Sequence, residues 1–164
     1  MTILGIDPGI ASTGYGIIHV CNGQARTEVY GEIDPKAETT FPQRLNRIYE
    51  GISEVITAYK PDHIAIEDVF YSKNIRSTLT IGQARGVAIL ASVRAGINIS
   101  EYAPREVKRA VVGSGAASKE QVQFMVKKLL GLDDSPLTGD AADALAVALC
   151  HANRVGINEL KEKA

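Results

Sequence analysis

Four carboxylates in this sequence stand where an acid is costly unless it has a partner. Asp7 and Glu67 each end a short apolar run, and Asp140 and Asp143 open an alanine-rich segment with i, i+3 spacing. Acids on apolar elements cost free energy unless they are paired, protonated or bound to a cation. No arginine adjoins any of them in sequence. A divalent cation is therefore the simplest partner, and metal-assisted phosphoryl chemistry is the first hypothesis.

Each acid taken alone also has a structural interpretation. Asp7 can begin a turn with the Pro8-Gly9 pair that follows it. Glu67 can be an exposed strand end or the partner of a basic residue. Asp140 and Asp143 are typical first-turn acids, which the helix dipole stabilises as anions. Together, on apolar elements, the four favour a metal site over four separate structural roles.

Hydrophobic patterning predicts the elements that must bring these acids together. Apolar runs predict strands over residues 2–7, 13–20, 24–33, 63–67 and 97–102, with an Asn22-Gly23 hairpin between the second and third. Helical spacing predicts helices that cover residues 45–59 and 75–95, a short one from residue 104, and two more over about 119–129 and 139–153. The sequence therefore predicts an α/β fold: a mixed five-stranded sheet, antiparallel in its first three strands, with helices on both faces.

Such a sheet can collect the four acids at one end. Adjacent strands can place Asp7 beside Glu67, and the i, i+3 spacing puts Asp140 and Asp143 on one helix face. Four convergent carboxylates can hold two Mg²⁺ or Mn²⁺ ions, because hard cations prefer oxygen ligands. Paired ions can activate a water and stabilise the leaving oxygen in an in-line displacement at a phosphodiester.

Composition limits the class of protein. The 164 residues suit one domain, which we expect over residues 1–157 with a polar tail over 158–164. Two cysteines, no signal-peptide pattern and no apolar run long enough for a bilayer predict a cytoplasmic protein without a membrane segment. Residues 73–128 hold ten Lys or Arg against three acids, although the net charge of the whole chain is −1. This asymmetry predicts a basic face that attracts phosphates.

Several segments together resemble one known family, the RuvC-type Holliday-junction resolvases. The similarity runs from about Thr2 to His151 in the family's order and spacing. It is carried by Gly5-Ile6-Asp7-Pro8-Gly9, Thr13-Gly14-Tyr15-Gly16, Ile66-Glu67-Asp68-Val69-Phe70, Gly82-Gln83-Ala84-Arg85-Gly86, Val111-Val112-Gly113-Ser114-Gly115 and Asp140-Ala141-Ala142-Asp143-Ala144-Leu145-Ala146.

The resemblance implies a ribonuclease H-like fold and a homodimer that resolves four-way DNA junctions by paired symmetric nicks in recombination and repair. It implies Mg²⁺ as cofactor, two ions per active site with Mn²⁺ as a substitute, and RuvA–RuvB as partners. The family's metal ligands fall on Asp7, Glu67, Asp140 and Asp143. Its functional lysines fall on Lys108 and Lys119.

The resemblance also implies DNA contacts in the segment after Glu67. Phe70 matches a family aromatic whose ring can stack on a base unpaired at the crossover. Tyr71, Lys73, Asn74 and Arg76 are candidates to hold phosphates or bases. Without the family, the two aromatic rings would be assigned to loop packing.

The predicted helix over residues 75–95 has more apolar and small residues than one buried face needs. A second copy packed on it would give an isologous dimer with two equivalent sites. Burial of this helix within one monomer remains an alternative.

Three other functions stay open from the residues alone. The glycine-rich turn after Asp7 also occurs in actin-like ATPases and sugar kinases, which usually need two such domains. A ribonuclease H-like nuclease that cuts structured RNA, or a protein that binds junctions without cutting, would share much of the same pattern.

Overall fold

The computed structural model describes residues 1–38, 40–68, 74–133 and 135–162, and their side chains as far as residue 156. In chain order the elements are β1 (Thr2–Asp7), β2 (Thr13–Cys21), β3 (Gln24–Ile33), α1 (Phe41–Tyr59), β4 (His63–Glu67), α2 (Ile75–Arg94), β5 (Asn98–Tyr102), α3 (Pro104–Val112), α4 (Lys119–Leu130) and α5 (Gly139–Glu162).

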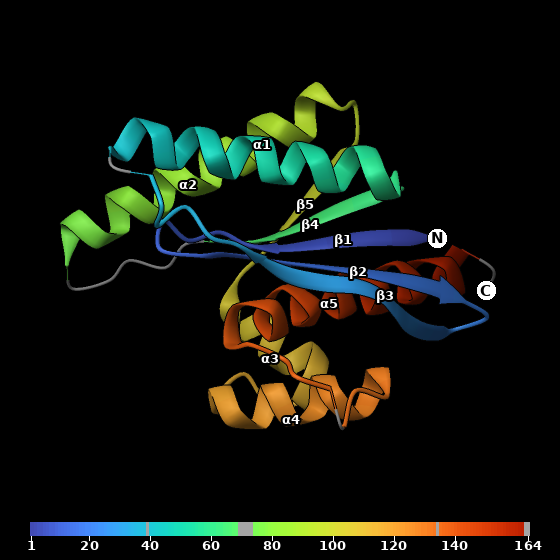
Figure 1. The fold of residues 1–164 in the computed structure, drawn as a ribbon. Helices are drawn as coiled ribbons and strands as arrows, with labels where there is room; N and C mark the ends of the chain where they lie inside the picture. Colours follow the sequence, from blue (N-terminus) through green and yellow to red (C-terminus); the bar gives the residue numbers. More distant parts are fainter. Residues whose placement is uncertain (39, 69–73, 134, 163–164) are drawn as a thin grey trace.

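The five strands form one mixed sheet in the order β3-β2-β1-β4-β5. β1 pairs antiparallel with β2, and β2 with β3, whereas β4 runs parallel to both β1 and β5. Helices α1 and α2 cover one face, and α5 covers the other with α3 and α4 beyond it (Figure 1). The predicted fold class is confirmed, including the three antiparallel strands at its start.

Close contact between α5 and the sheet depends on glycines in β1 and β2. A Cβ on Gly5 would lie 2.0 Å from the Ala144 carbonyl oxygen, and a Cβ on Gly14 would lie 2.0 Å from the Asp140 carbonyl oxygen. Only glycine allows the helix backbone to approach a strand this closely. Because Gly14 pairs with Asp7 across the strands, the start of α5 is held beside the end of β1.

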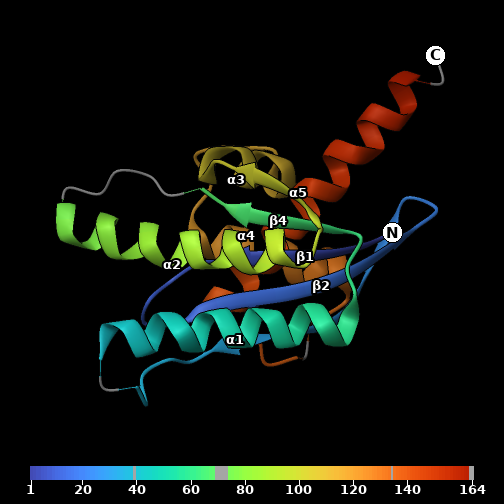
Figure 2. The same cartoon turned by 90° about the horizontal axis from the view of Figure 1, so that it is seen from above.

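The last helix is longer than the sequence pattern predicted. It continues to Glu162 instead of ending near Asn153, and its final turns extend away from the sheet (Figure 2). The apolar periodicity that marks a buried helix stops where the helix leaves the core, but the residues beyond Asn153 include no proline to end it. Residues 158–162 of the predicted tail are therefore helical.

Helix α2 divides its small residues between two environments. Ala84, Ala88 and Ala91 are buried in the core that α2 forms with α1 and the sheet, whereas a Cβ on Gly82 or Gly86 would have no described atom within 4 Å. The monomer thus uses the alanines and leaves the glycines on the outside. Among the helices that the structure describes, none is long and apolar enough to span a bilayer.

Candidate active site

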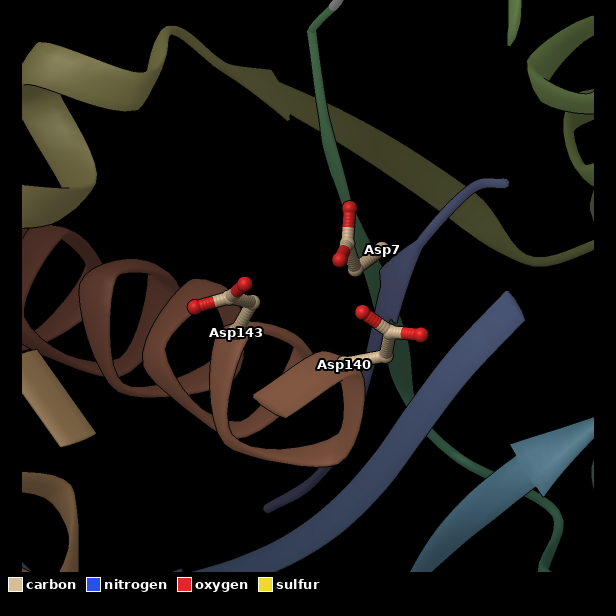
Figure 3. A group of neighbouring side chains, drawn as sticks. All are labelled: Asp7, Asp140 and Asp143. Carbon is tan, nitrogen blue, oxygen red and sulfur yellow. The ribbon is translucent and has the colours of Figure 1, made fainter. Parts of the chain in front are cut away.

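Three of the four predicted acids converge at one end of the sheet. Asp7 ends β1, while Asp140 and Asp143 lie in the first turns of α5. One carboxylate oxygen from each lies within 4.8 Å of the other two. Figure 3 shows the three side chains side by side, where the end of β1 meets the start of α5. Oxygen atoms at this spacing from two separate elements are a donor set that fits a hard divalent cation.

Glu67 stands beside this group because β4 is the parallel neighbour of β1. It is not among the three acids with mutually close oxygens, but its side chain hydrogen-bonds that of Asp7. In this arrangement a protonated Glu67 donates to the Asp7 carboxylate. All four predicted acids are therefore at one site, with Glu67 in contact through Asp7.

The acids raise one another's pKa. Burial is the largest cause for Asp7, followed by the charges of Asp143 and Asp140, and together they raise its pKa from 3.8 to about 7. Burial, and then the charges of Asp7 and Asp143, raises the pKa of Glu67 from 4.5 to about 8. The cluster therefore resists full ionisation at neutral pH unless positive charge enters it.

One lysine supplies part of that charge. The Lys119 Nζ lies 2.6 Å from an Asp143 carboxylate oxygen, and the hydrogen bond to Asp143 raises the lysine's pKa. Helix α4 presents this lysine in its first turn, which a capping box stabilises: the Ser118 hydroxyl accepts from the Gln121 backbone N–H, and the Gln121 side-chain oxygen accepts from the Ser118 backbone N–H. The sequence placed Lys119 near the acids only through the family resemblance, and its ion pair with Asp143 was not predicted.

Lys108 faces the same region from α3. Together with Lys119, Glu67 and Asp143 it lines a hollow of about 140 Å³ whose other walls are apolar residues of α3, α4 and α5. Two cations and two acids thus border one recess.

The predicted DNA contacts have a mixed outcome. Phe70, Tyr71 and Lys73 lie outside the described residues. Asn74 is the N-cap of α2, where its Oδ1 accepts from the backbone N–H groups of Arg76 at 3.0 Å and Ser77 at 3.3 Å. The signal for this cap was in the sequence, since asparagine directly before a helical pattern is a preferred N-cap.

Arg76 is exposed in the first turn of α2, and contact with DNA remains a prediction for it and for Asn74. Arg85, which forms ion pairs with two acids beside the site, was not predicted as a site residue. Its partners are Asp68 and Glu101, which no local spacing connects to it.

Comparison with known proteins agrees with this geometry. The family model for "Crossover junction endodeoxyribonuclease RuvC" matches residues 3–151. Curated proteins of that description from Geobacter metallireducens and Syntrophomonas wolfei are 51% and 46% identical to the chain, over 98% and 99% of it and 97% and 94% of their own lengths. The structure of Thermus thermophilus RuvC in complex with a Holliday junction substrate superposes with a TM-score of 0.89 at 33% identity, over 96% of both chains. The chain therefore belongs to the RuvC family of crossover junction endodeoxyribonucleases, which confirms the family, the fold class and the class of enzyme that its motifs predicted.

Proposed function

We propose that this chain cleaves four-way DNA junctions at the site formed by Asp7, Glu67, Asp140 and Asp143. The observation that carries the proposal is the convergence of the three aspartate carboxylates within 4.8 Å. The family match and the junction-bound relative favour a DNA junction over structured RNA or a nucleotide as the substrate. Intact acids also favour cleavage over binding alone.

The donor set fits a divalent cation and favours Mg²⁺. All four side chains offer carboxylate oxygens, which suit hard cations such as Mg²⁺. None offers a thiolate sulfur or an imidazole nitrogen, the ligands that softer metals prefer. Burial, and then the charges of neighbouring acids, raises the pKa of Asp7 and of Glu67, so a cation in the site would stabilise their charged forms. Four carboxylates are enough to hold two Mg²⁺ ions, and Mn²⁺ can substitute for Mg²⁺. When bound, such ions activate a water for in-line attack and offset the charge of the phosphodiester.

The chain's own residues contribute by holding charge in place. Lys119 fixes the carboxylate of Asp143 through its 2.6 Å contact. Lys108 lines the same recess, so the two ammonium groups can hold a phosphate and stabilise negative charge as it develops. Base stacking by Phe70 and partnership with RuvA–RuvB remain predictions from the family resemblance.

The direct test uses a synthetic four-way junction with Mg²⁺ or with a chelator. Asp7→Asn is expected to abolish cleavage while junction binding persists, because the amide removes a charged ligand at nearly the same volume. The matched control is Asp133→Asn, an exposed acid paired with Lys128 at 3.0 Å. Cleavage that survives in Asp7→Asn would refute the assigned site, and preferential cutting of structured RNA would refute the substrate.

The exposed face of α2 supports a homodimer. Ile75, Leu79, Leu90 and Val93 are 75%, 63%, 52% and 59% exposed, and with Gly82 and Gly86 they follow one stripe along the helix. The glycines lie in the middle of the stripe with the large side chains toward its ends. Two such helices related by a twofold axis can cross closely at the glycines and bury the apolar ends.

The dimer is tested by placing a charge in this stripe. Leu79→Glu is expected to give a monomer in analytical ultracentrifugation and to replace paired nicking with separate single nicks. Leu129→Glu on α4 is the control, since Leu129 is 48% exposed but distant in sequence from the stripe. A Leu79→Glu protein that stays dimeric would exclude this helix as the interface.

A further inference from the structure

Arg85 makes an ion-pair cluster beside the site that the proposed chemistry does not use. From α2 its Nη2 lies 3.3 Å from an Asp68 carboxylate oxygen and also forms an ion pair with Glu101. The Arg85 side chain is only 23% exposed, and its Nε is buried without a hydrogen-bond partner among the described residues. A guanidinium this enclosed and directed at two acids holds a fixed position.

Its two partners lie at the ends of β4, which carries Glu67, and of the neighbouring strand β5. Asp68 directly follows Glu67, and its backbone N–H donates to the Tyr102 carbonyl at 2.8 Å, which continues the pairing of β4 with β5. Glu101 pairs with Ile66 across the same two strands. Arg85 therefore joins β4 and β5 at the point where Glu67 leaves the sheet.

The cluster acts from the sheet face opposite to α5. Side chains alternate along β5, and Tyr102 lies in the core on the α5 side, so the neighbouring Glu101 is directed toward α2. Asp68 and Glu101 share a single nitrogen of Arg85. Without the guanidinium, these two like charges would lie close together on adjacent strand ends, next to a site already rich in acids.

We propose that Arg85 is a positioning residue: by holding Asp68 and Glu101 it fixes the end of β4 and hence the carboxylate of Glu67 within the metal site. This inference rests on the proposed function. It also gives α2 a second role, because the helix proposed to meet the other copy is the helix that fixes Glu67.

The test compares Arg85→Ala with Arg94→Ala, an exposed arginine in the last turn of the same helix. Three quantities are measured for each variant. They are the single-turnover rate of junction cleavage, the affinity for the junction in Ca²⁺, and the Mg²⁺ concentration that gives half of the maximal rise in Tm. Arg85→Ala is expected to lower the cleavage rate about tenfold and to need several-fold more Mg²⁺ in both assays, since loosening a ligand's support weakens metal affinity and activity together. Junction affinity is expected to change much less.

Conservative and partner variants separate positioning from folding. Arg85→Lys keeps the charge without the planar fork, so it is expected to recover part of the rate. Asp68→Asn is expected to lower the rate in the same direction but by less, because Arg85 keeps its ion pair with Glu101. Combining it with Arg85→Ala is expected to lower the rate by less than the sum of the two single effects, because both changes remove the contact between Arg85 and Asp68. If Arg85→Ala does not fold, Arg85→Lys and Asp68→Asn carry the test through the Mg²⁺ dependence of their cleavage and thermal stability.

Three results would overturn the proposal: wild-type cleavage and Mg²⁺ dependence in folded Arg85→Ala, equal losses in Arg94→Ala, or a loss of rate that matches a loss of junction binding. The last result would make Arg85 a DNA contact. Failure of the proposed function would look different, because wild-type protein itself would then not cut the junction, or Asp7→Asn would still cut it.

Discussion

Removing one charge from the acid cluster is expected to stabilise the metal-free protein while it abolishes activity. Burial and neighbouring charges raise the pKa of Asp7 from 3.8 to about 7. An unfolded chain ionises this acid near its ordinary pKa, so folding at pH 8 must place an unfavourable charge in the site. Asp7→Asn removes that charge and keeps the side chain's size.

The pKa values give the sign and scale of the effect. Both Asp7 and Glu67 have folded-state pKa values above their ordinary ones. Their protonated forms favour the fold at low pH, and that stability is lost as pH rises from about 4 to about 8. Each pH unit is worth about 1.4 kcal/mol, so Asp7 alone would account for at most about 4 kcal/mol. Because neighbouring acids share this repulsion and the buried amide has its own cost, we expect a gain of about 1–3 kcal/mol.

Thermal unfolding in a chelator measures this directly. At pH 8 the gain corresponds to about 3–10 °C in Tm for a chain of this size, and the gain is expected to shrink at pH 5. Added Mg²⁺ is expected to stabilise wild-type protein strongly and Asp7→Asn weakly, since the variant has lost a ligand. Asp133→Asn is the control and is expected to match wild type within about 0.5 kcal/mol. An Asp7→Asn protein less stable than wild type at pH 8, or equally stabilised by Mg²⁺, would refute this account of the cluster.

Two further predictions concern the groups that hold the acids. Lys119→Met is expected to slow junction cleavage at least tenfold and to tighten Mg²⁺ binding measured by calorimetry, because it removes the ammonium group that pairs with Asp143. Lys128→Met is the control. Unchanged or weaker Mg²⁺ binding in Lys119→Met, or the same effect in Lys128→Met, would contradict this. Gly14→Ala is expected to destabilise the fold by about 1–3 kcal/mol in denaturant unfolding, because its Cβ would meet helix backbone at 2.0 Å. Gly156→Ala in α5, which meets nothing described within 4 Å, is expected to be neutral or stabilising, and equal losses in both variants would count against the close-contact explanation.

The sequence predicted those parts of the site that depend on local pattern. A strand that ends in an acid places that acid at a sheet edge, and parallel pairing of β4 with β1 puts Glu67 beside Asp7. Spacing of i, i+3 put Asp140 and Asp143 on one face of α5, where Figure 3 shows them beside Asp7. Each of these inferences needed only the period of an element and the direction of its neighbour.

Long-range ion pairs could not be predicted in this way. Lys119 meets Asp143 because α4 packs near the start of α5, and Arg85 meets Asp68 because α2 lies near the ends of β4 and β5. The sequence shows how many charged residues there are, but it does not show which of them lie side by side in the fold. That depends on how the helices pack on the sheet. The same limit applied to α2, where only packing decided that Ala84 lies inside and the glycines outside.

The packing of α5 explains why the site must be neutralised and cannot simply relax. Residues 144–150 of this helix are all buried, and its backbone contacts Gly5 and Gly14 of the sheet without room for a Cβ. Asp140 and Asp143 therefore cannot move away from Asp7 unless the helix leaves the core. Their repulsion can be relieved by protons, by the Lys119 ammonium or by divalent ions. Since divalent ions add the most charge, a rigid apolar core is what gives the acidic end of this sheet its affinity for metal.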